Sequence, residues 1–509
     1  MPAVVTSPVS QTPEHEGEIT LYVILCEIIA AFGGFLLGYE IGISIGLSSM
    51  DDFLMKFFMT MYDEKKRVQE DNYCKYHNEF LQLFTSSLYI AALGASFAAS
   101  EVCSKFGRRV TMQIASLFII TGVAFQAGSI NIAMLVFGRI ILGCGVGFVS
   151  LAVPLFLSEL APARTRGALN ICFQLFITIG VLMFNIINYF TFNIHPHGWR
   201  ISFGLAGIPA TMLLGASFAI CETPTSLIER NQFELGKATL RRIRGTDNVA
   251  AEFNLIVAAS KAARQVKHPF RKLMALSSRP PLVIAILLQV FQHFTGIDAI
   301  MFYAPVLFQM AGFGNNAVLL STVITGLVKV FSTLVSMYTV DRAGRRVLLL
   351  EGCVQMFINQ TVIGLLLLLH LKPTGSLHPT EAMVTLVLAS GFMMGFAWSW
   401  GPLGWLIPSE TFPLETRTAG FACAVSFNML LIVIFAQAFL PMLCHMKAGT
   451  FFFFAAWIVA FGLFTVFFVP ETKGVPVDLM VESVWKQHWF WKRYMINDDE
   501  PADDNVNKG

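Results

Sequence analysis

The sequence predicts an all-α transmembrane protein whose twelve helices form two parallel halves of six. The first observation is composition: 55% of the 509 residues belong to the hydrophobic set and 13% are charged. A soluble domain carries about 25% charged residues, whereas side chains that face lipid need no polarity. The second is the recurrence of apolar segments about 20 residues long, which is the length that crosses a bilayer. The third is a set of motifs that occurs twice in the same order.

Twelve segments are long and apolar enough to span a membrane, and the longest polar interruption divides them six and six. The first segment follows a polar start and is typical of a retained helix rather than a cleaved signal. The expected helices are 20–48, 82–103, 111–128, 131–155, 167–190, 200–221, 281–309, 317–339, 347–370, 382–407, 418–442 and 450–469. The expected organisation is an N-terminal tail (1–19), a first half (20–221), a central loop with helices (222–280), a second half (281–469) and a C-terminal tail (470–509).

The distribution of Lys and Arg predicts the orientation. Residues 222–279 hold eleven Lys or Arg against five Asp or Glu, whereas residues 49–81 hold five against seven. Because basic loops stay on the cytoplasmic side, we expect the central loop and both termini to be cytoplasmic. The 49–81 loop is then an external lid. The formal net charge of +2 gives no reason to expect nucleic acid as a partner.

Three motifs of the first half return in the second half. Their spacing is nearly constant, with offsets of 237, 251 and 249 residues. Since six helices bring the chain back to its starting side, the halves are parallel repeats, which can expose a central site to each side in turn. The repeated pairs are Gly107-Arg108-Arg109 with Gly344-Arg345-Arg346, Ser158-Glu159 with Ser409-Glu410, and Glu222-Thr223 with Glu471-Thr472.

Further motifs complete an ordered set along residues 18–495. They are Gly138-Arg139, Pro154-Leu-Phe-Leu-Ser-Glu159, Trp400-Gly-Pro-Leu-Gly-Trp405, Ile407-Pro-Ser-Glu410 and Pro470-Glu-Thr-Lys-Gly474. The set closely resembles the major facilitator superfamily, its sugar porter branch and, within it, the plant proton-coupled monosaccharide (hexose) transporters. The resemblance implies a symporter with a monosaccharide and a proton as partners, most simply in the plasma membrane. It implies no cofactor, no metal, no catalysis and no obligatory protein partner.

Among the charged residues inside predicted spans are Glu40 in the first helix and Arg139 in the fourth. A carboxylate at membrane depth normally faces a cavity or a partner. It can alternate between protonated and ionised forms, as proton coupling requires. The resemblance implies that Glu40 carries the proton and Arg139 senses its charge, although the family has Asp in place of Glu40. A static structural ion pair is the alternative.

The expected sugar site consists of amide and aromatic side chains, because sugar hydroxyls both donate and accept and a sugar ring has a weakly apolar face. The resemblance points to Gln174, Gln292, His293, Asp298, Lys329, Trp405 and Asn428. For any single amide, an interhelical hydrogen bond is the alternative. At three of these positions this chain departs from the family: it has His293, Asp298 and Lys329 where the family has amides. We expect Asp298 and Lys329 to form a compensating ion pair, because either charge alone would be costly to bury.

Arginines and glutamates gather at the predicted cytoplasmic ends of the helices. Arg–Glu pairs there would hold the inner side closed until substrate or proton shifts the balance. The alternative is that the arginines only fix orientation and contact headgroups. The resemblance favours a gate composed of Arg108, Arg109, Glu159, Arg166, Glu222, Arg345, Arg346, Glu410, Arg417 and Glu471.

Two of the nine cysteines, Cys74 and Cys444, fall on the predicted external side. An oxidising exterior allows such thiols to bond, and the resemblance implies that this disulfide tethers the lid to the second half. Two free thiols are the alternative.

Three functions remain open at this stage. Proton-coupled hexose import is the expectation. Glu40 argues against uncoupled diffusion, while Asp298 and Lys329 keep an altered sugar or polyol substrate open. A sugar sensor that has lost transport is the third possibility.

Overall fold

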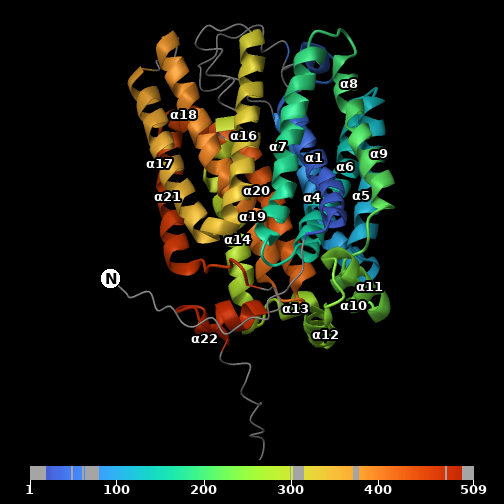
Figure 1. Ribbon diagram of the computed structural model, residues 1–509. Coiled ribbons are helices and arrows are strands. Elements are labelled where there is room, and N and C mark those ends of the chain that lie inside the picture. Colours follow the sequence, from blue (N-terminus) through green and yellow to red (C-terminus); the bar gives the residue numbers. More distant parts are fainter. Residues whose placement is uncertain are drawn as a thin grey trace, which may run out of the picture.

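Helices make up nearly all of the chain that the computed structural model describes, which comprises residues 19–46, 50–59, 62, 79–298, 300–301, 315–370, 378–475 and 479–495. Within these residues there is no β-strand. Figure 1 shows long helices side by side, with a group of short helices below one end of the bundle.

The first half contains α1 (Leu21–Gly46), α2 (Asp51–Phe57), α4 (Glu79–Phe106), α5 (Arg108–Ala127), α6 (Ile132–Leu160), α7 (Arg166–Thr191), α8 (Gly198–Leu205) and α9 (Gly207–Ser217). The short group contains α10 (Pro224–Glu229), α11 (Phe233–Arg244), α12 (Ala250–Arg264) and α13 (Pro269–Lys272). The second half contains α14 (Arg279–Phe294), α16 (Asn315–Ala343), α17 (Arg345–His370), α18 (Pro379–Trp398), α19 (Trp400–Thr411), α20 (Arg417–Met446) and α21 (Gly449–Phe468), followed by α22 (Lys492–Met495).

Ten segments of the described residues are long and apolar enough to cross a membrane. The predicted span 200–221 is instead divided into α8 and α9 around Ala206. The predicted span 281–309 begins as α14 and runs past the described residues. The predicted span 382–407 breaks at Ser399 between α18 and α19. With these breaks allowed for, the twelve-helix fold predicted from the sequence is confirmed.

The two halves meet along two pairs of long helices. Helix α7 packs along α16, and α4 packs along α20. Within the first half, α1 packs on α7, while α6 packs on both α4 and α5. Residues on α1, α4, α7, α16 and α20 can therefore face the boundary between the halves.

Glycines bring α1 against α7. Gly34, Gly38, Gly42 and Gly46 recur every fourth residue of α1 and so share one face. A Cβ on Gly38 would lie 2.0 Å from the carbonyl oxygen of Ile177 on α7, which is well inside van der Waals contact. Small residues at this spacing allow membrane helices to approach closely. The stripe fixes α1, and with it Glu40, against α7.

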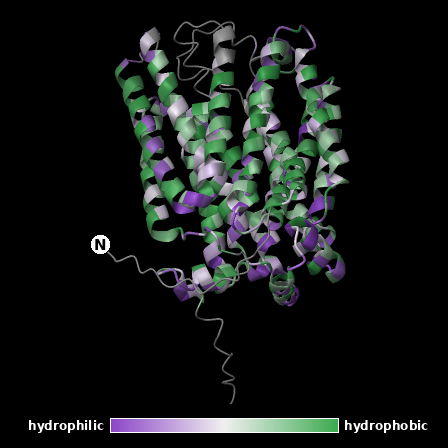
Figure 2. Ribbon diagram, in the orientation of Figure 1, coloured by the Kyte–Doolittle hydropathy of each residue, from purple (hydrophilic) through white to green (hydrophobic). Residues whose placement is uncertain are grey.

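The outside of the bundle suits a lipid environment. Large apolar side chains such as Leu117, Phe331 and Val387 are exposed on the long helices. Figure 2 shows hydrophobic colour over most of their length and hydrophilic colour gathered around α10–α13. The end of the bundle that carries α10–α13 is called the central-loop end below, and the opposite end is called the outer end.

Candidate transport site and gate

Glu40 and Arg139 meet inside the first half, where α1 crosses α6. The Glu40 side chain is 2% exposed and the Arg139 side chain 0%. One contact joins them, from Arg139 Nη1 to Glu40 Oε2 at 3.4 Å. The other carboxylate oxygen, Oε1, is buried and has no hydrogen-bond partner among the described residues. The predicted pair is thus present, but it is long and uses only one of the two oxygens.

The rest of the Arg139 guanidinium is held by neutral groups. Nη2 donates to Ser44 Oγ at 3.2 Å, and Ser44 lies one helical turn after Glu40. The guanidinium also lies 4.3 Å from the centre of the Phe84 ring on α4, a cation–π contact. Arg139 would therefore keep its position if Glu40 lost its charge.

Four polar side chains form a hydrogen-bonded network at the boundary between the halves. Asn428 Nδ2 on α20 lies 2.8 Å from Gln289 Oε1, 3.1 Å from Gln292 Oε1 and 3.1 Å from His293 Nε2, all three on α14. All four residues are buried. The structure thus brings together three of the residues predicted for the sugar site, Gln292, His293 and Asn428.

Both glutamines are oriented by backbone carbonyls of α19. Gln289 Nε2 donates to the Gly404 carbonyl at 2.6 Å. Gln292 Nε2 donates to the carbonyls of Trp400 and Gly401 at 3.1 and 3.0 Å. Since a carbonyl oxygen only accepts, both Oε1 atoms must point toward Asn428.

The Asp298 side chain pairs with His293. Asp298 Oδ2 lies 3.1 Å from His293 Nδ1. The chain turns at Thr295 and Gly296, where the Gly296 φ is 82°, and this brings residue 298 back beside residue 293. Among the described residues, Asp298 thus pairs with an imidazole five residues earlier in the chain.

The expected direct ion pair between Asp298 and Lys329 is therefore wrong. Among the described residues, no hydrogen bond or ion pair joins the two side chains. The Asp298 charge still acts on the Lys329 ammonium, which belongs to α16 of the same half. Lys329 lies on α16, half-buried, one turn from Gly326, and Gly326 packs against Leu182 of α7.

The two remaining sugar-site candidates lie on the opposite side of the network. Trp405 on α19 is 7% exposed. Its ring packs edge-on against the Phe173 ring of α7, with 5.5 Å between the ring centroids. Gln174 follows Phe173 on α7, is buried, and makes no hydrogen bond to another described residue. Phe173 therefore places Trp405 and Gln174 near one another along the bundle.

The gate residues of the first half form a buried cluster at the central-loop end. The Arg108 side chain, 0% exposed, donates to Glu159 Oε1 at 2.7 Å and to Glu229 Oε2 at 2.9 Å. Glu222 accepts from the backbone N–H groups of Arg108 and Arg109, at the N-terminus of α5. Burial raises the pKa of Glu222 and of Glu229, and the nearby Arg108 charge opposes that rise.

The second half repeats this cluster. Arg345 Nη2 donates to Glu410 Oε1 at 2.8 Å, and its Nη1 donates to Asp341 Oδ1 at 3.1 Å. Glu471 accepts from the backbone N–H groups of Arg345 and Arg346, as Glu222 does in the first half. The repeat seen in the sequence is thus also a repeat of contacts.

Two predicted gate arginines have different partners from those expected. The prediction that the side chains of Arg109 and Arg346 pair with glutamates is wrong. Their guanidinium groups instead donate to backbone carbonyls, those of Phe218 and Val466 respectively. Since Glu222 and Glu471 cap the helix N-termini, they face the backbone of these arginines and not their side chains.

Several contacts between the halves lie near the central-loop end. Asp341 of the second half accepts from the backbone N–H groups of Gly167 and Ala168 of the first half, at 3.2 and 2.8 Å. Arg417 Nη1 lies 3.7 Å from Glu159 Oε1 across the same boundary. Arg166 Nη1 donates to the Val475 carbonyl at 3.3 Å. These contacts hold the central-loop end closed.

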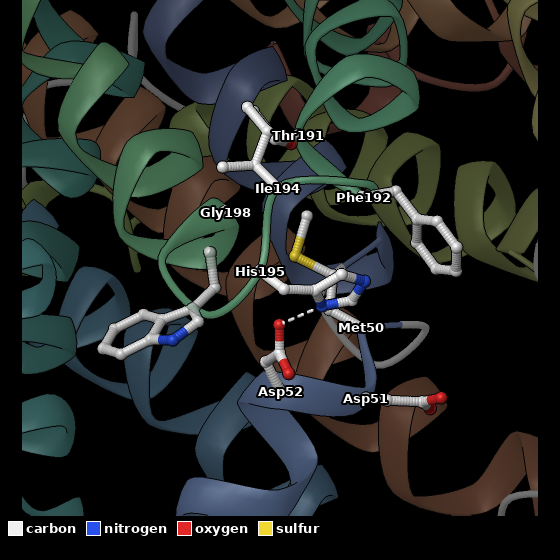
Figure 3. Close-up of a pocket in the computed structure, with 9 residues that line it drawn as sticks. Met50, Asp51, Asp52, Thr191, Phe192, Ile194, His195 and Gly198 are labelled. Carbon is white, nitrogen blue, oxygen red and sulfur yellow. Dashed lines mark hydrogen bonds and ion pairs between the residues drawn. The ribbon is translucent and has the colours of Figure 1, made fainter.

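At the outer end, α2 and the α7–α8 connection enclose a cavity of about 190 Å³ (Figure 3). His195 Nδ1 and Asp52 Oδ2 lie 2.5 Å apart at its edge, and the His195 side chain is 65% exposed. Cys444 lies at the same end, on α20, and is not among the seven free cysteines. Cys74 lies outside the described residues, so the disulfide stays a prediction.

Four residues that the sequence interpretation did not single out join these sites. Gln289 precedes Gln292 by one helical turn, a spacing that puts both on one face. Ser44 follows Glu40 by four residues for the same reason. Glu229 and Asp341 carry no motif of their own, and only the fold brings them to Arg108 and Arg345.

Comparison with known proteins supports a single family. The family model described as "Sugar (and other) transporter" matches residues 26–484. Sugar transport protein 8 of Arabidopsis thaliana is 61% identical over 98% of this chain and 98% of its own length. Sugar transport protein MST4 of rice (Oryza sativa subsp. japonica) is 58% identical, over 96% and 95%.

Solved structures show the same fold. The proton:xylose symporter XylE bound to 6-bromo-6-deoxy-D-glucose is 26% identical, with 91% of this chain and 98% of that chain covered and a TM-score of 0.77. The inward-open conformation of XylE from E. coli gives a TM-score of 0.66 at 25% identity, over 90% and 99%. The resemblance to sugar porters is confirmed, and the chain belongs to the sugar (and other) transporter family.

Proposed function

We propose that this protein imports monosaccharides together with protons by alternating access. The proposal rests on the Glu40 carboxylate, of which one oxygen is paired and the other is not. It is buried beside Arg139, makes one long contact, and leaves its other oxygen without a partner. A proton on Oε1 would cost no existing hydrogen bond, so Glu40 can exist in both protonation states at this position.

In the proposed cycle, a proton from the outer side neutralises Glu40 and weakens its hold on Arg139. The side chains around Asn428 bind the sugar between the halves, with Gln174 donating and Trp405 covering the ring face. The Arg108 and Arg345 clusters then open, and the halves of residues 20–221 and 281–469 rock so that the site faces the central-loop end. Release of sugar and proton returns the protein to its starting state.

Names of similar proteins support the sugar and the proton. The Arabidopsis and rice relatives are named sugar transport proteins, and XylE is described as a proton:xylose symporter. We place the protein in the plasma membrane with both termini and the central-loop end in the cytoplasm. That orientation follows from the eleven basic residues of segment 222–279.

The test is uptake of labelled glucose, galactose and fructose in a yeast strain that lacks its own hexose carriers, between pH 5 and 8. We expect acid-stimulated accumulation that a protonophore collapses. Glu40→Gln, which mimics the protonated acid, should exchange sugar to equilibrium without accumulating it. Surface expression of the wild type without any uptake would overturn the proposal and favour a sensor. Uptake that ignores pH and the protonophore would overturn the coupling.

A further inference from the structure

Hydrogen-bond directions around Asn428 determine where the His293 proton lies. Backbone carbonyls of α19 require the Nε2 groups of Gln289 and Gln292, so both Oε1 atoms face Asn428 as acceptors. Asn428 must then present its Nδ2 group, the donor, to both. The same Nδ2 lies 3.1 Å from His293 Nε2. Nδ2 carries two protons for these three acceptors, so one N–H is shared between two of them. Since Nδ2 itself cannot accept, the ring nitrogen that faces it carries no proton.

The other ring nitrogen completes the assignment. With Nε2 unprotonated, a neutral imidazole carries its proton on Nδ1. Nδ1 lies 3.1 Å from Asp298 Oδ2, so it donates to that carboxylate. The Phe435 ring stacks on the imidazole with the centroids 6.1 Å apart, which keeps the ring from turning over. Each partner of His293 is thus matched to the neutral form.

Protonation would break this arrangement. A proton added to Nε2 from the aqueous side turns that atom into a donor, and it would then point at another donor, Asn428 Nδ2. Asn428 can satisfy it only by turning its oxygen toward His293, which removes both of its hydrogen bonds to the glutamines. No such change is available to Gln289 and Gln292, because the α19 carbonyls fix them.

We propose that His293 is a proton-sensitive positioning residue, which keeps Asn428 oriented for sugar only while its imidazole is neutral. The inference rests on the proposed function and adds a second proton site to it. Glu40 needs a proton for import, whereas His293 must stay free of one for tight sugar binding. We therefore expect sugar binding to weaken at acidic pH.

Charged and titratable groups near His293 come from several elements. Asp298 contacts it directly, and Lys329 of α16, in the same half, is within reach of the Asp298 charge. Tyr89 of α4 is also within reach of that charge, and Glu40 and Arg139 act on Tyr89.

The experiment compares wild type with His293→Gln, whose amide can replace the hydrogen bonds but does not titrate. We expect the ratio of the wild-type KM to the variant KM for hexose to rise at least threefold between pH 7 and pH 5, the range in which imidazoles titrate. The ratio cancels effects of Glu40, which both proteins share. A matched control is His195→Gln, which removes the exposed imidazole at the outer cavity and should leave the ratio flat.

A ratio that stays constant with pH for His293→Gln overturns the inference. If the variant does not reach the membrane, sugar binding to purified Glu40→Gln, in which residue 40 does not titrate, answers the same question through intrinsic tryptophan fluorescence. Binding at pH 5 that is at least threefold weaker than at pH 7 supports the inference, and equal binding overturns it. Because binding needs no transport, a failure of the proposed function would remain distinguishable from a failure of this one.

Discussion

At the scale of single residues, two carboxylates of the bundle have different partners. Glu40, which is buried, makes one long contact with an arginine, whereas Asp298, 30% exposed, pairs with an imidazole. The first pairing was predictable, because a buried acid and a buried base in adjacent spans have few other options. The second was not, because it depends on a turn at Gly296 that no hydrophobic pattern reveals.

The longer-range coupling of Asp298 and Lys329 gives the first prediction. We expect Asp298→Asn alone to lower the yield of folded protein, because the Lys329 ammonium loses its opposing charge inside the bundle. The Asp298→Asn, Lys329→Asn double variant should recover part of that loss, with a coupling energy of about 1 kcal/mol or more.

The measurement is the monodisperse peak in fluorescence-detected size-exclusion chromatography. The Lys329→Asn single variant completes the cycle. Additive effects of the two substitutions would mean that the two charges act independently. That result would contradict the coupling between Asp298 and Lys329.

At the scale of elements, the sequence located the helices well but not the breaks within them. Long apolar runs determine where a chain crosses the bilayer. The breaks at Ala206 and Ser399 leave the hydrophobicity unchanged, and each lies three residues before a proline, Pro209 or Pro402, which cannot donate to the carbonyl four residues earlier. The close approach of α1 to α7 was present in the sequence as glycines four residues apart, although only the neighbouring backbone reveals how little room remains.

The second prediction concerns that approach. Gly38→Ala should destabilise the protein by about 1–3 kcal/mol, because the added methyl group would meet the Ile177 carbonyl at 2.0 Å and force α1 away from α7. Thermal unfolding of the detergent-purified protein measures this as a lower Tm.

Gly94→Ala is the control. It lies on α4, where an added Cβ has nothing within 4 Å, so its Tm should equal or exceed that of the wild type. Equal Tm values for all three proteins would show that α1 and α7 separate at little cost.

At the scale of the whole molecule, the doubled motifs correspond to doubled contact clusters, one around Arg108 and one around Arg345. This symmetry was predictable from the repeat. The contacts that cross between the halves were not, because Asp341 binds backbone N–H groups of Gly167 and Ala168, which no side-chain motif marks.

The third prediction addresses this cross-half contact. Asp341→Ala removes two bonds that a charged acceptor receives from the other half, and such bonds contribute about 1.5–3 kcal/mol. Sugar arriving from outside needs the state in which the central-loop end is closed. The external KM for hexose should therefore rise about tenfold, a shift of about 1.4 kcal/mol in favour of the open end.

Initial rates of uptake across sugar concentrations provide the KM. Asp341→Asn retains one acceptor oxygen and should lie between wild type and Asp341→Ala. Glu101→Gln removes an exposed ion pair with Lys105 at the end of α4 and should leave KM unchanged. A KM that is the same in all four proteins would mean that this contact does not control closure.

The buried state of the two arginine clusters has a consequence for a cell under osmotic stress. Dissolved ions screen charges that water can reach, over a distance of about 8 Å at physiological ionic strength. Arg108 and Arg345 are 0% and 1% exposed, and Glu159 and Glu410 are 1% and 2% exposed. Dissolved potassium should therefore weaken these two pairs little while they are closed. The carrier should keep the same balance between its two faces in dilute and in concentrated cytoplasm.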